Sequence, residues 1–339
     1  MWVDDILGSG FRQVTLPLFD DDEGEVVTTL VKYTPADDPL AFDGTPSSPR
    51  FAFLALHGWN DYFYHAHLAR SIARAGGAFY ALDLRKYGRS LRDHQTPGYI
   101  TALSDYDDDV HAARDIILDT DGDLPFVLYG HSTGGLTASL WADRHPGALA
   151  GLVLNSPWLE LQGSTLLRHI SAPILSSLAK YSPDTVLPAE DLGFYDRALS
   201  GYDTADRIVD RDDPFESGGW PFNRQWRTNP SAPVRVGWLN AILDGHKQVA
   251  DGLDIRCPII VLTSRTTLFS STWSEKMREA DTVLDVKQIW SRVPNLGPVT
   301  TLIQLEGAIH DVILSRRDVR DRALSEITRW LGTYLTPHP

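Results

Sequence analysis

The sequence predicts an α/β fold: a mostly parallel, doubly wound sheet with an antiparallel N-terminal hairpin and an inserted helical cap. Three observations support this prediction. Buried-strand and helix patterns alternate between residues 51 and 155, as in a parallel sheet that is covered on both faces. Two stretches of alternating apolar and polar residues precede them. The alternation stops near residue 157 and resumes at residue 258.

The patterns assign each element in turn. Alternation with a period of two and an acidic run at 20–24 predict the hairpin, and continuous apolar runs predict strands that are buried on both faces. Helices are expected where apolar residues recur at helical spacing. The expected elements are a hairpin (11–19 and 25–33), strands at 51–56, 78–84, 126–129, 149–155, 258–262 and 299–305, and helices at 64–75, 105–118, 136–144, 273–279, 286–292 and 319–335.

The break in the alternation predicts how the chain divides. Residues 1–156 and 251–339 are expected to form one α/β core, and residues 157–250 are expected to form a cap inserted into it. The cap segment is rich in large apolar residues, which favours an apolar substrate channel beneath it. Because ligands on parallel sheets bind at the carboxyl ends of the strands, the site is expected between core and cap.

Composition limits the classes of function. The chain has 339 residues, a formal net charge of −14 and 42% hydrophobic residues. The negative charge argues against nucleic-acid binding, and no apolar run is long enough for membrane insertion. The single cysteine, Cys257, and the acidic N-terminus favour a reducing compartment, so we expect a cytoplasmic protein. The oligomeric state is left open.

A strand–turn–helix pattern centres on Ser132. The strand ends in Gly130-His-Ser-Thr-Gly134, and the helix follows at once. A sharp turn of this kind lifts a serine hydroxyl clear of the backbone, where a base and a substrate can reach it, and glycines on both sides remove clashing side chains. The helix start directs free N–H groups toward a developing oxyanion. We therefore expect Ser132 to be a nucleophile.

A nucleophilic serine needs a histidine base and an acid that orients it. In proteins with this turn, the acid and then the histidine follow the serine along the chain. His310 lies after the last expected strand and is the candidate base. Asp281 is the favoured acid, with Asp285 as the alternative, since either aspartate could instead cap a helix.

The remaining site residues are expected around this triad. The backbone N–H groups of Trp59 and Thr133 are candidates for the oxyanion hole. His57, His131 and Trp158 are expected to contact the substrate. We expect neither a cofactor nor a metal ion, because a Ser-Asp-His triad needs none.

Four motifs carry a resemblance to a known family: the His57-Gly58 strand end, Asp83-Leu-Arg-Lys-Tyr-Gly-Arg-Ser90, Gly130-His-Ser-Thr-Gly134, and the turn from Gly307 to His310-Asp311. The sequence resembles the α/β-hydrolase superfamily, in its serine aminopeptidase/monoacylglycerol lipase-like branch, over residues 50–335. Bacterial members are often labelled lysophospholipases. The resemblance implies ester hydrolysis by a Ser-acid-His triad. Two features depart from it: the bulky Trp59 after His-Gly, and an acid that lies far from its strand.

Three hypotheses follow. The first is a serine hydrolase that cleaves carboxylic esters with an apolar acyl part, such as monoacylglycerols, lysophospholipids or small esters. The second is an aminopeptidase or amidase with the same triad, in which cap acids bind the substrate ammonium; the candidates are Glu160, Glu190, Asp191 and Glu216. The third is a ligand-binding homologue without catalysis. The expected partner of the leading hypothesis is a small-molecule ester.

Overall fold

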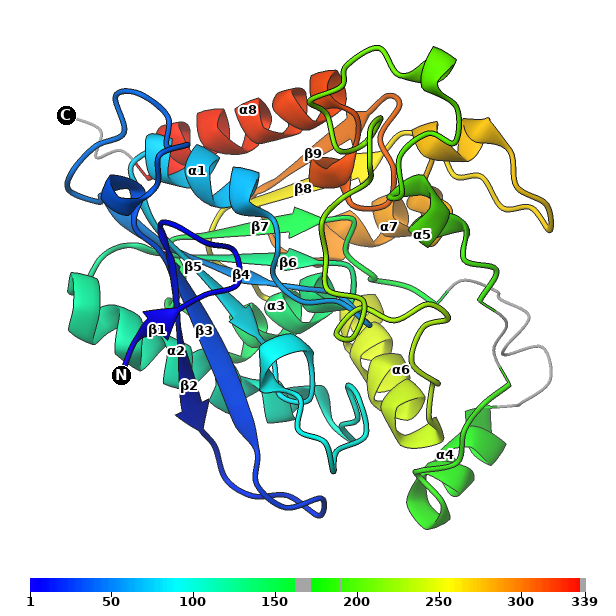
Figure 1. Ribbon diagram of the computed structural model, residues 1–339. Helices are drawn as coiled ribbons and strands as arrows, with labels where there is room; N and C mark the ends of the chain where they lie inside the picture. Colours follow the sequence, from blue (N-terminus) through cyan, green and yellow to red (C-terminus); the bar gives the residue numbers. More distant parts are fainter. Residues whose placement is uncertain (162–171, 189–190, 336–339) are drawn as a thin grey trace.

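The computed structural model describes residues 1–161, 172–188 and 191–335 (Figure 1). Nine strands in these residues form one sheet in the order β1-β2-β3-β5-β4-β6-β7-β8-β9. The strands are β1 (Val3–Asp4), β2 (Phe11–Pro17), β3 (Val27–Tyr33), β4 (Phe51–Leu56), β5 (Gly77–Asp83), β6 (Phe126–His131), β7 (Gly151–Asn155), β8 (Ile259–Ser264) and β9 (Thr300–Leu305).

The sheet has an antiparallel part and a parallel part, as the sequence predicted. β2 pairs antiparallel with β3, with Phe11 opposite Tyr33, and β3 pairs antiparallel with β5. From β5 through β4, β6, β7 and β8 to β9 every pairing is parallel. The predicted hairpin and the mostly parallel, doubly wound sheet are both confirmed.

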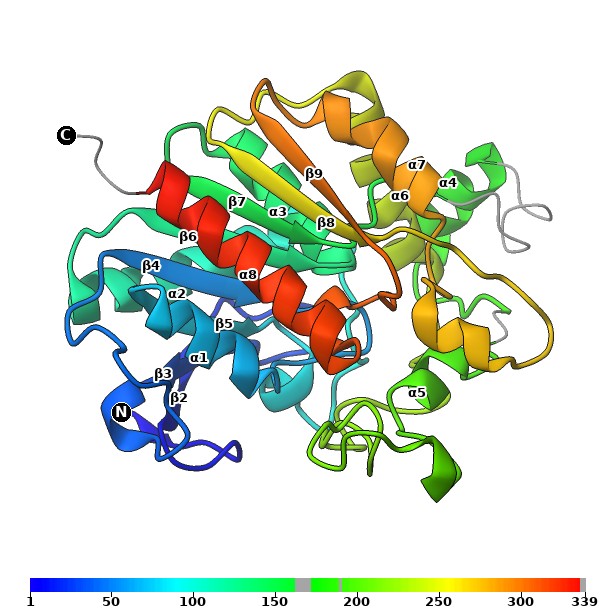
Figure 2. The same cartoon turned by 90° about the horizontal axis from the view of Figure 1, so that it is seen from above.

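Helices cover both faces of the sheet (Figure 2). The α-helices are α1 (Ala66–Arg74), α2 (Tyr106–Asp121), α3 (Thr133–Arg144), α4 (Ala172–Tyr181), α5 (Phe194–Ala198), α6 (Val236–Asp251), α7 (Val286–Arg292) and α8 (Arg317–Tyr334). Buried side chains of α1 and α8 form a core on one face, and those of α2, α3 and α6 form a core on the other.

Strand β6 shows why a continuous apolar run is needed in the centre of the sheet. Successive side chains of a strand point to opposite faces. Leu128 accordingly packs into the core with α2 and α3, whereas Val127 and Tyr129 pack into the core with α1 and α8. Both cores therefore require apolar residues from the same strand.

Two helical predictions differ from the structure. α3 begins at Thr133, three residues before the predicted start, because Gly134 and Gly135 are already helical. The helix expected over 273–279 is a short 3₁₀ helix, η5 (Glu275–Glu279). Glycines are common in turns, so the sequence alone predicts a turn here. In the structure, Gly134 and Gly135 allow the helix to begin close to the chain at His57 and Pro157.

The described parts of residues 157–235 lie beyond the carboxyl ends of the parallel strands (Figure 1). They consist of α4, α5 and long irregular stretches. α6 lies at the end of the predicted cap and packs against α3. Its residues Trp238 and Ile242 belong to the core that α2 and α3 help to form. The boundaries of core and cap stay a prediction.

Candidate active site

Ser132 stands on a strained turn between β6 and α3. Its φ of 54° and ψ of −117° lie in a region that non-glycine residues rarely adopt. A Cβ atom on Gly130 would lie closer than 3.0 Å to the Gly134 carbonyl, and one on Gly134 would lie equally close to the carbonyl of His57. The two glycines therefore allow β6, α3 and the end of β4 to meet around the serine.

His310 and Asp281 form a buried pair. The Nδ1 atom of His310 lies 2.8 Å from Oδ2 of Asp281, and the aspartate is fully buried. The other carboxylate oxygen, Oδ1, accepts hydrogen bonds from the N–H groups of Val283 (2.8 Å) and Leu284 (2.7 Å). These bonds fix the carboxylate toward the imidazole, which therefore presents its Nε2 atom away from the aspartate.

The two aspartates that the sequence offers as the acid, Asp281 and Asp285, have different surroundings in the structure. Asp285 is the N-cap of α7, and its side chain accepts a hydrogen bond from the Lys287 N–H at 3.0 Å. Asp281 is distant in sequence from the end of β8, but a β-bridge pairs it with Thr267, only three residues after β8 ends at Ser264. The intervening residues form a loop that returns Asp281 to the sheet edge.

Ser132 and His310 line the same cavity, which has a volume of about 180 Å³. Trp59 and His131 line it as well, so four of the predicted site residues share one space. Most of the other lining side chains are polar. They are Asn60, Asp61, Asp191, Tyr195, Asp196, Arg227, Thr228, Asn229 and Ser231, together with Gly58 and Val283.

His57 and Trp158 are not among the residues that line this cavity. The Nε2 atom of His57 accepts a hydrogen bond from the Leu84 N–H at 3.1 Å, and its Nδ1 donates to the Gly58 carbonyl at 2.8 Å. The ring thus joins the ends of β4 and β5. The centroid of the Trp158 ring lies 6.1 Å from that of the Trp238 ring. Trp158 contacts Ser132 through its backbone, where the Trp158 N–H donates to the Ser132 carbonyl.

His131 is buried beside His310, with 4.9 Å between the ring centroids. Its Nδ1 atom donates to the Asn155 carbonyl at 3.2 Å, and burial lowers its pKa to about 4. Asp311 turns away from His310 and accepts a hydrogen bond from the Asn155 side chain at 2.6 Å. His131 is therefore a neutral ring that packs beside His310 under ordinary conditions.

The two candidate oxyanion donors come from the ends of two neighbouring strands, β6 and β4. Thr133 is the first residue of α3, and Trp59 follows the end of β4. Within the described residues, the backbone N–H groups of Trp59 and Thr133 make no hydrogen bond to a backbone carbonyl. Trp59 lines the cavity, whereas Thr133 is buried and is not among its lining residues.

Known proteins share the fold and part of the sequence of this chain. Residues 47–211 match the family model of serine aminopeptidase, S33. A carboxyl esterase from Bacillus coagulans has the same fold, with a TM-score of 0.62 and 19% identity over 96% of this chain and 99% of the esterase. A monoglyceride lipase from Saccharomyces cerevisiae matches with a TM-score of 0.61 and 14% identity, over 94% and 95% of the two chains. The protein has the α/β-hydrolase fold.

The predicted resemblance of this chain to the monoacylglycerol lipase-like branch is confirmed. It is 30% identical to a monoacylglycerol lipase of Mycolicibacterium smegmatis over 175 residues, which are 49% of this chain and 59% of the lipase. The chain spans less than two thirds of the length of the curated relatives that it matches.

Sequence reasoning missed several residues of the cavity that Ser132 and His310 line. Arg227 is buried, its Nη1 atom lies 2.7 Å from Asp196, and its Nε lies 3.6 Å from Asp61. Burial raises the pKa of Asp61 above its ordinary value. The ring of Tyr195 meets that of His310 edge-on at 5.5 Å, and its buried hydroxyl has no hydrogen-bond partner in the described part of the chain. No motif marks these residues, because Asp61 and Arg227 come from irregular segments and Tyr195 comes from the short helix α5.

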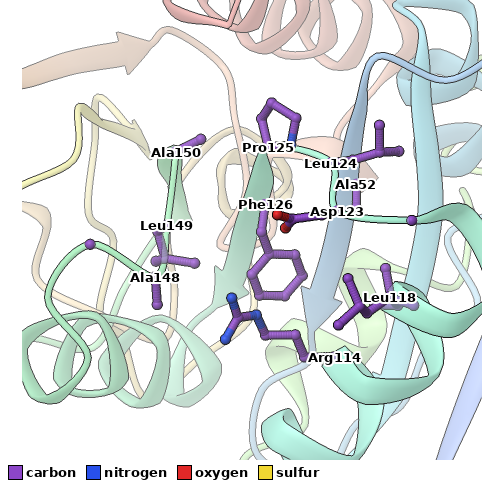
Figure 3. A pocket seen from close by; sticks show the side chains of 13 residues that line it. Ala52, Arg114, Leu118, Asp123, Leu124, Pro125, Phe126, Ala148, Leu149 and Ala150 are labelled. Carbon is purple, nitrogen blue, oxygen red and sulfur yellow. The ribbon is translucent and has the colours of Figure 1, made fainter.

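A second cavity, of about 380 Å³, lies at the opposite end of the sheet (Figure 3). Phe126, at the start of β6, lines it together with Ala52 and Leu149, and Arg114 reaches over the phenylalanine ring. Ser132 follows the other end of β6. This cavity is therefore separate from the candidate active site.

Among residues 1–161, 172–188 and 191–335, no group of three or more histidine, cysteine, aspartate or glutamate side chains is arranged to hold a metal ion. No helix in the same residues is long and apolar enough to cross a membrane.

Proposed function

We propose that this α/β hydrolase cleaves carboxylic esters through an acyl-enzyme, with Ser132 as nucleophile, His310 as base and Asp281 as the orienting acid. One observation carries the proposal. The buried His310–Asp281 pair shares a cavity with a serine that is held on a strained strand-to-helix turn. Nucleophile, base and acid in this arrangement are the parts that acyl transfer requires.

The chemistry follows from the tautomer of His310. Its Nδ1–H donates to Asp281, so Nε2 is free to take the proton of the Ser132 hydroxyl as the oxygen attacks the ester carbonyl. The tetrahedral oxyanion accepts hydrogen bonds from the N–H groups of Trp59 and Thr133, each a contribution of about 3 kcal/mol. His310 then gives its proton to the leaving alcohol. A water molecule repeats the sequence on the acyl-enzyme and releases the acid.

The expected substrates are esters with an apolar acyl part. The relatives support this class, since one is named monoacylglycerol lipase and another phospholipase. A volume of about 180 Å³ is smaller than the roughly 300–1,000 Å³ that is typical of small-molecule pockets. A small ester fits within this space, and a long acyl chain must extend beyond it.

The aminopeptidase or amidase alternative requires an acid that is free to bind an ammonium group. Of the four predicted cap acids, Glu190 lies outside the described residues, and only Asp191 lines the cavity. Asp191 already accepts hydrogen bonds from Gly193 and Ser231. Glu160 pairs with Arg292, and Glu216 accepts from two backbone N–H groups. These occupied carboxylates favour the ester over the peptide.

The test is hydrolysis of p-nitrophenyl esters from acetate to laurate by the wild type and by Ser132→Ala, with aminoacyl p-nitroanilides in parallel. We expect ester turnover in the wild type and loss of at least about 10³-fold in the variant. Preference for the anilides would favour the aminopeptidase. Absence of turnover on both series would favour the homologue without catalysis.

A further inference from the structure

Three consecutive residues of the loop after Trp59 are each joined to one distant stretch of chain, residues 223–232, which we call the bracing segment. Asn60 bonds to Thr228 and Ala232. Asp61 pairs with Arg227. The hydroxyl of Tyr62 accepts a hydrogen bond from the Asn223 N–H at 2.6 Å. The loop that carries a candidate oxyanion donor therefore rests on the bracing segment.

Asn60 makes the most direct of these connections. Its Nδ2 donates to the Thr228 carbonyl at 2.8 Å. Its Oδ1 accepts from the Thr228 hydroxyl at 2.9 Å and from the Ala232 N–H at 3.2 Å. Asn60 has a φ of 54°, a left-handed conformation that asparagine tolerates better than most residues. Both polar atoms of its side chain bond to the bracing segment, so Asn60 ties the loop to that segment.

The bracing segment is itself held in place. Arg227 links it to Asp196 of α5, and the Asn229 side chain donates to the same aspartate at 3.0 Å. The Ser231 N–H donates to Asp191 at 3.1 Å. The segment thus has anchors on both sides of Thr228, and it can serve as a fixed support for Asn60.

We propose that Asn60 is a positioning residue, which holds the Trp59 N–H at the oxyanion through its bonds to Thr228 and Ala232. The proposal rests on the proposed function, in which Trp59 supplies an oxyanion donor. An oxyanion donor is effective only when it lies about 2.7–3.1 Å from the developing negative charge. A loop without a support samples many positions. When the Trp59 N–H moves away from the oxyanion, stabilisation of the transition state weakens more than binding of the substrate does.

Two variants and a matched control test this proposal. Thr228→Val removes the hydroxyl donor while keeping the side-chain shape, and Asn60→Gly removes all three bonds while tolerating the left-handed backbone. Ser200→Ala is the control, because its hydroxyl bonds to the Asp196 carbonyl and to none of residues 59–62. For each protein we would measure kcat and KM on p-nitrophenyl acetate, inhibition by phenylboronic acid, and hydrogen exchange of a peptide spanning residues 57–64.

The expected losses fall on kcat. We expect kcat to fall about three- to tenfold in Thr228→Val and about 10- to 100-fold in Asn60→Gly, with KM within about twofold. Boronate affinity should fall with kcat/KM, because the boronate forms a tetrahedral adduct that uses the same donors. Hydrogen exchange of the peptide should rise in both variants, and Ser200→Ala should match the wild type.

Unchanged kcat and boronate affinity in both variants would overturn the proposal, as would hydrogen exchange equal to that of the wild type. If Asn60→Gly does not fold, Thr228→Val decides. If the wild type neither hydrolyses esters nor binds the boronate, the proposed function fails. The exchange comparison then still shows whether Asn60 orders the loop.

Discussion

Asp281→Asn is the substitution that most sharply tests the role of the buried pair. An asparagine is nearly the same shape, and its side-chain oxygen can still accept from the Val283 and Leu284 N–H groups. Its NH₂ group then faces Nδ1 of His310, where the carboxylate oxygen lies at 2.8 Å in the native protein. That NH₂ group donates, so His310 must carry its proton on Nε2 instead.

A proton on Nε2 leaves no base for Ser132. In a serine protease, the corresponding change leaves the geometry intact and lowers kcat about 10⁴-fold. We expect a similar loss here, which corresponds to about 5.4 kcal/mol of transition-state stabilisation at 1.36 kcal/mol per tenfold. The assay is steady-state hydrolysis of p-nitrophenyl acetate, with thermal unfolding measured alongside to show that the fold is retained.

Asp285→Asn is the matched control, because asparagine remains a good N-cap for α7. It should retain wild-type kcat within about twofold. A kcat for Asp281→Asn within tenfold of the wild type would refute the reasoning. A loss of kcat in Asp285→Asn but not in Asp281→Asn would show that Asp285 is the acid of the triad.

Two further predictions concern stability. Gly134→Ala places a methyl group against the His57 carbonyl and should lower the free energy of unfolding by more than about 2 kcal/mol. In Gly332→Ala of α8, the added Cβ meets no atom within 4 Å outside the helix's own backbone, so the free energy of unfolding should rise by about 0.5–1 kcal/mol. Urea unfolding of the two variants measures both changes, and equal effects would contradict the close approach of Gly134 to His57. Burial lowers the pKa of His131 and of His246 from 6.5 to about 4. Between pH 4 and 6.5 the unfolded chain therefore binds more protons than the folded protein does. The free energy of unfolding should fall as the pH falls through that window. His246→Gln should make this pH dependence shallower in urea titrations at pH 7, 5.5 and 4.5, and an unchanged slope would show that the ring is not buried in its neutral form.

The parts of the fold that sequence predicted well are those with local patterns. β6 is a continuous apolar run because both of its faces are buried, and β2 of the hairpin alternates because one of its faces packs on the core. The start of α3 was predicted late, since Gly134 and Gly135 resemble a turn when their neighbours are unknown. Their need for close backbone contact is a tertiary property.

The candidate site divides in the same way. Ser132 and His310 could be predicted because each stands at a fixed place relative to a strand, and both line one cavity. Asp281 could be predicted only from the chain order of the triad. The β-bridge to Thr267, which places Asp281 near the end of β8, could not be predicted from the sequence. The roles of these residues in catalysis stay a prediction.

The contacts that sequence could not supply are those between distant segments. Asn60 and Thr228 are 168 residues apart, and neither belongs to a motif that pairs them. His57 was expected at the substrate because it adjoins a strand end, and Trp158 was expected there as a large apolar residue of the predicted cap. Their rings turn elsewhere, since His57 completes hydrogen bonds between strands and Trp158 packs beside Trp238. Position next to a strand end does not determine the direction of a side chain.

Covalent labelling tests the central claim most directly. The protein would be treated with a fluorophosphonate, digested, and analysed by mass spectrometry, with His310→Ala treated in the same way. We predict one adduct on the peptide that contains Ser132, and slowing by at least about 10³-fold without the histidine base. An adduct on another residue, no adduct at all, or equal labelling in His310→Ala would contradict the assignment of Ser132 as an activated nucleophile.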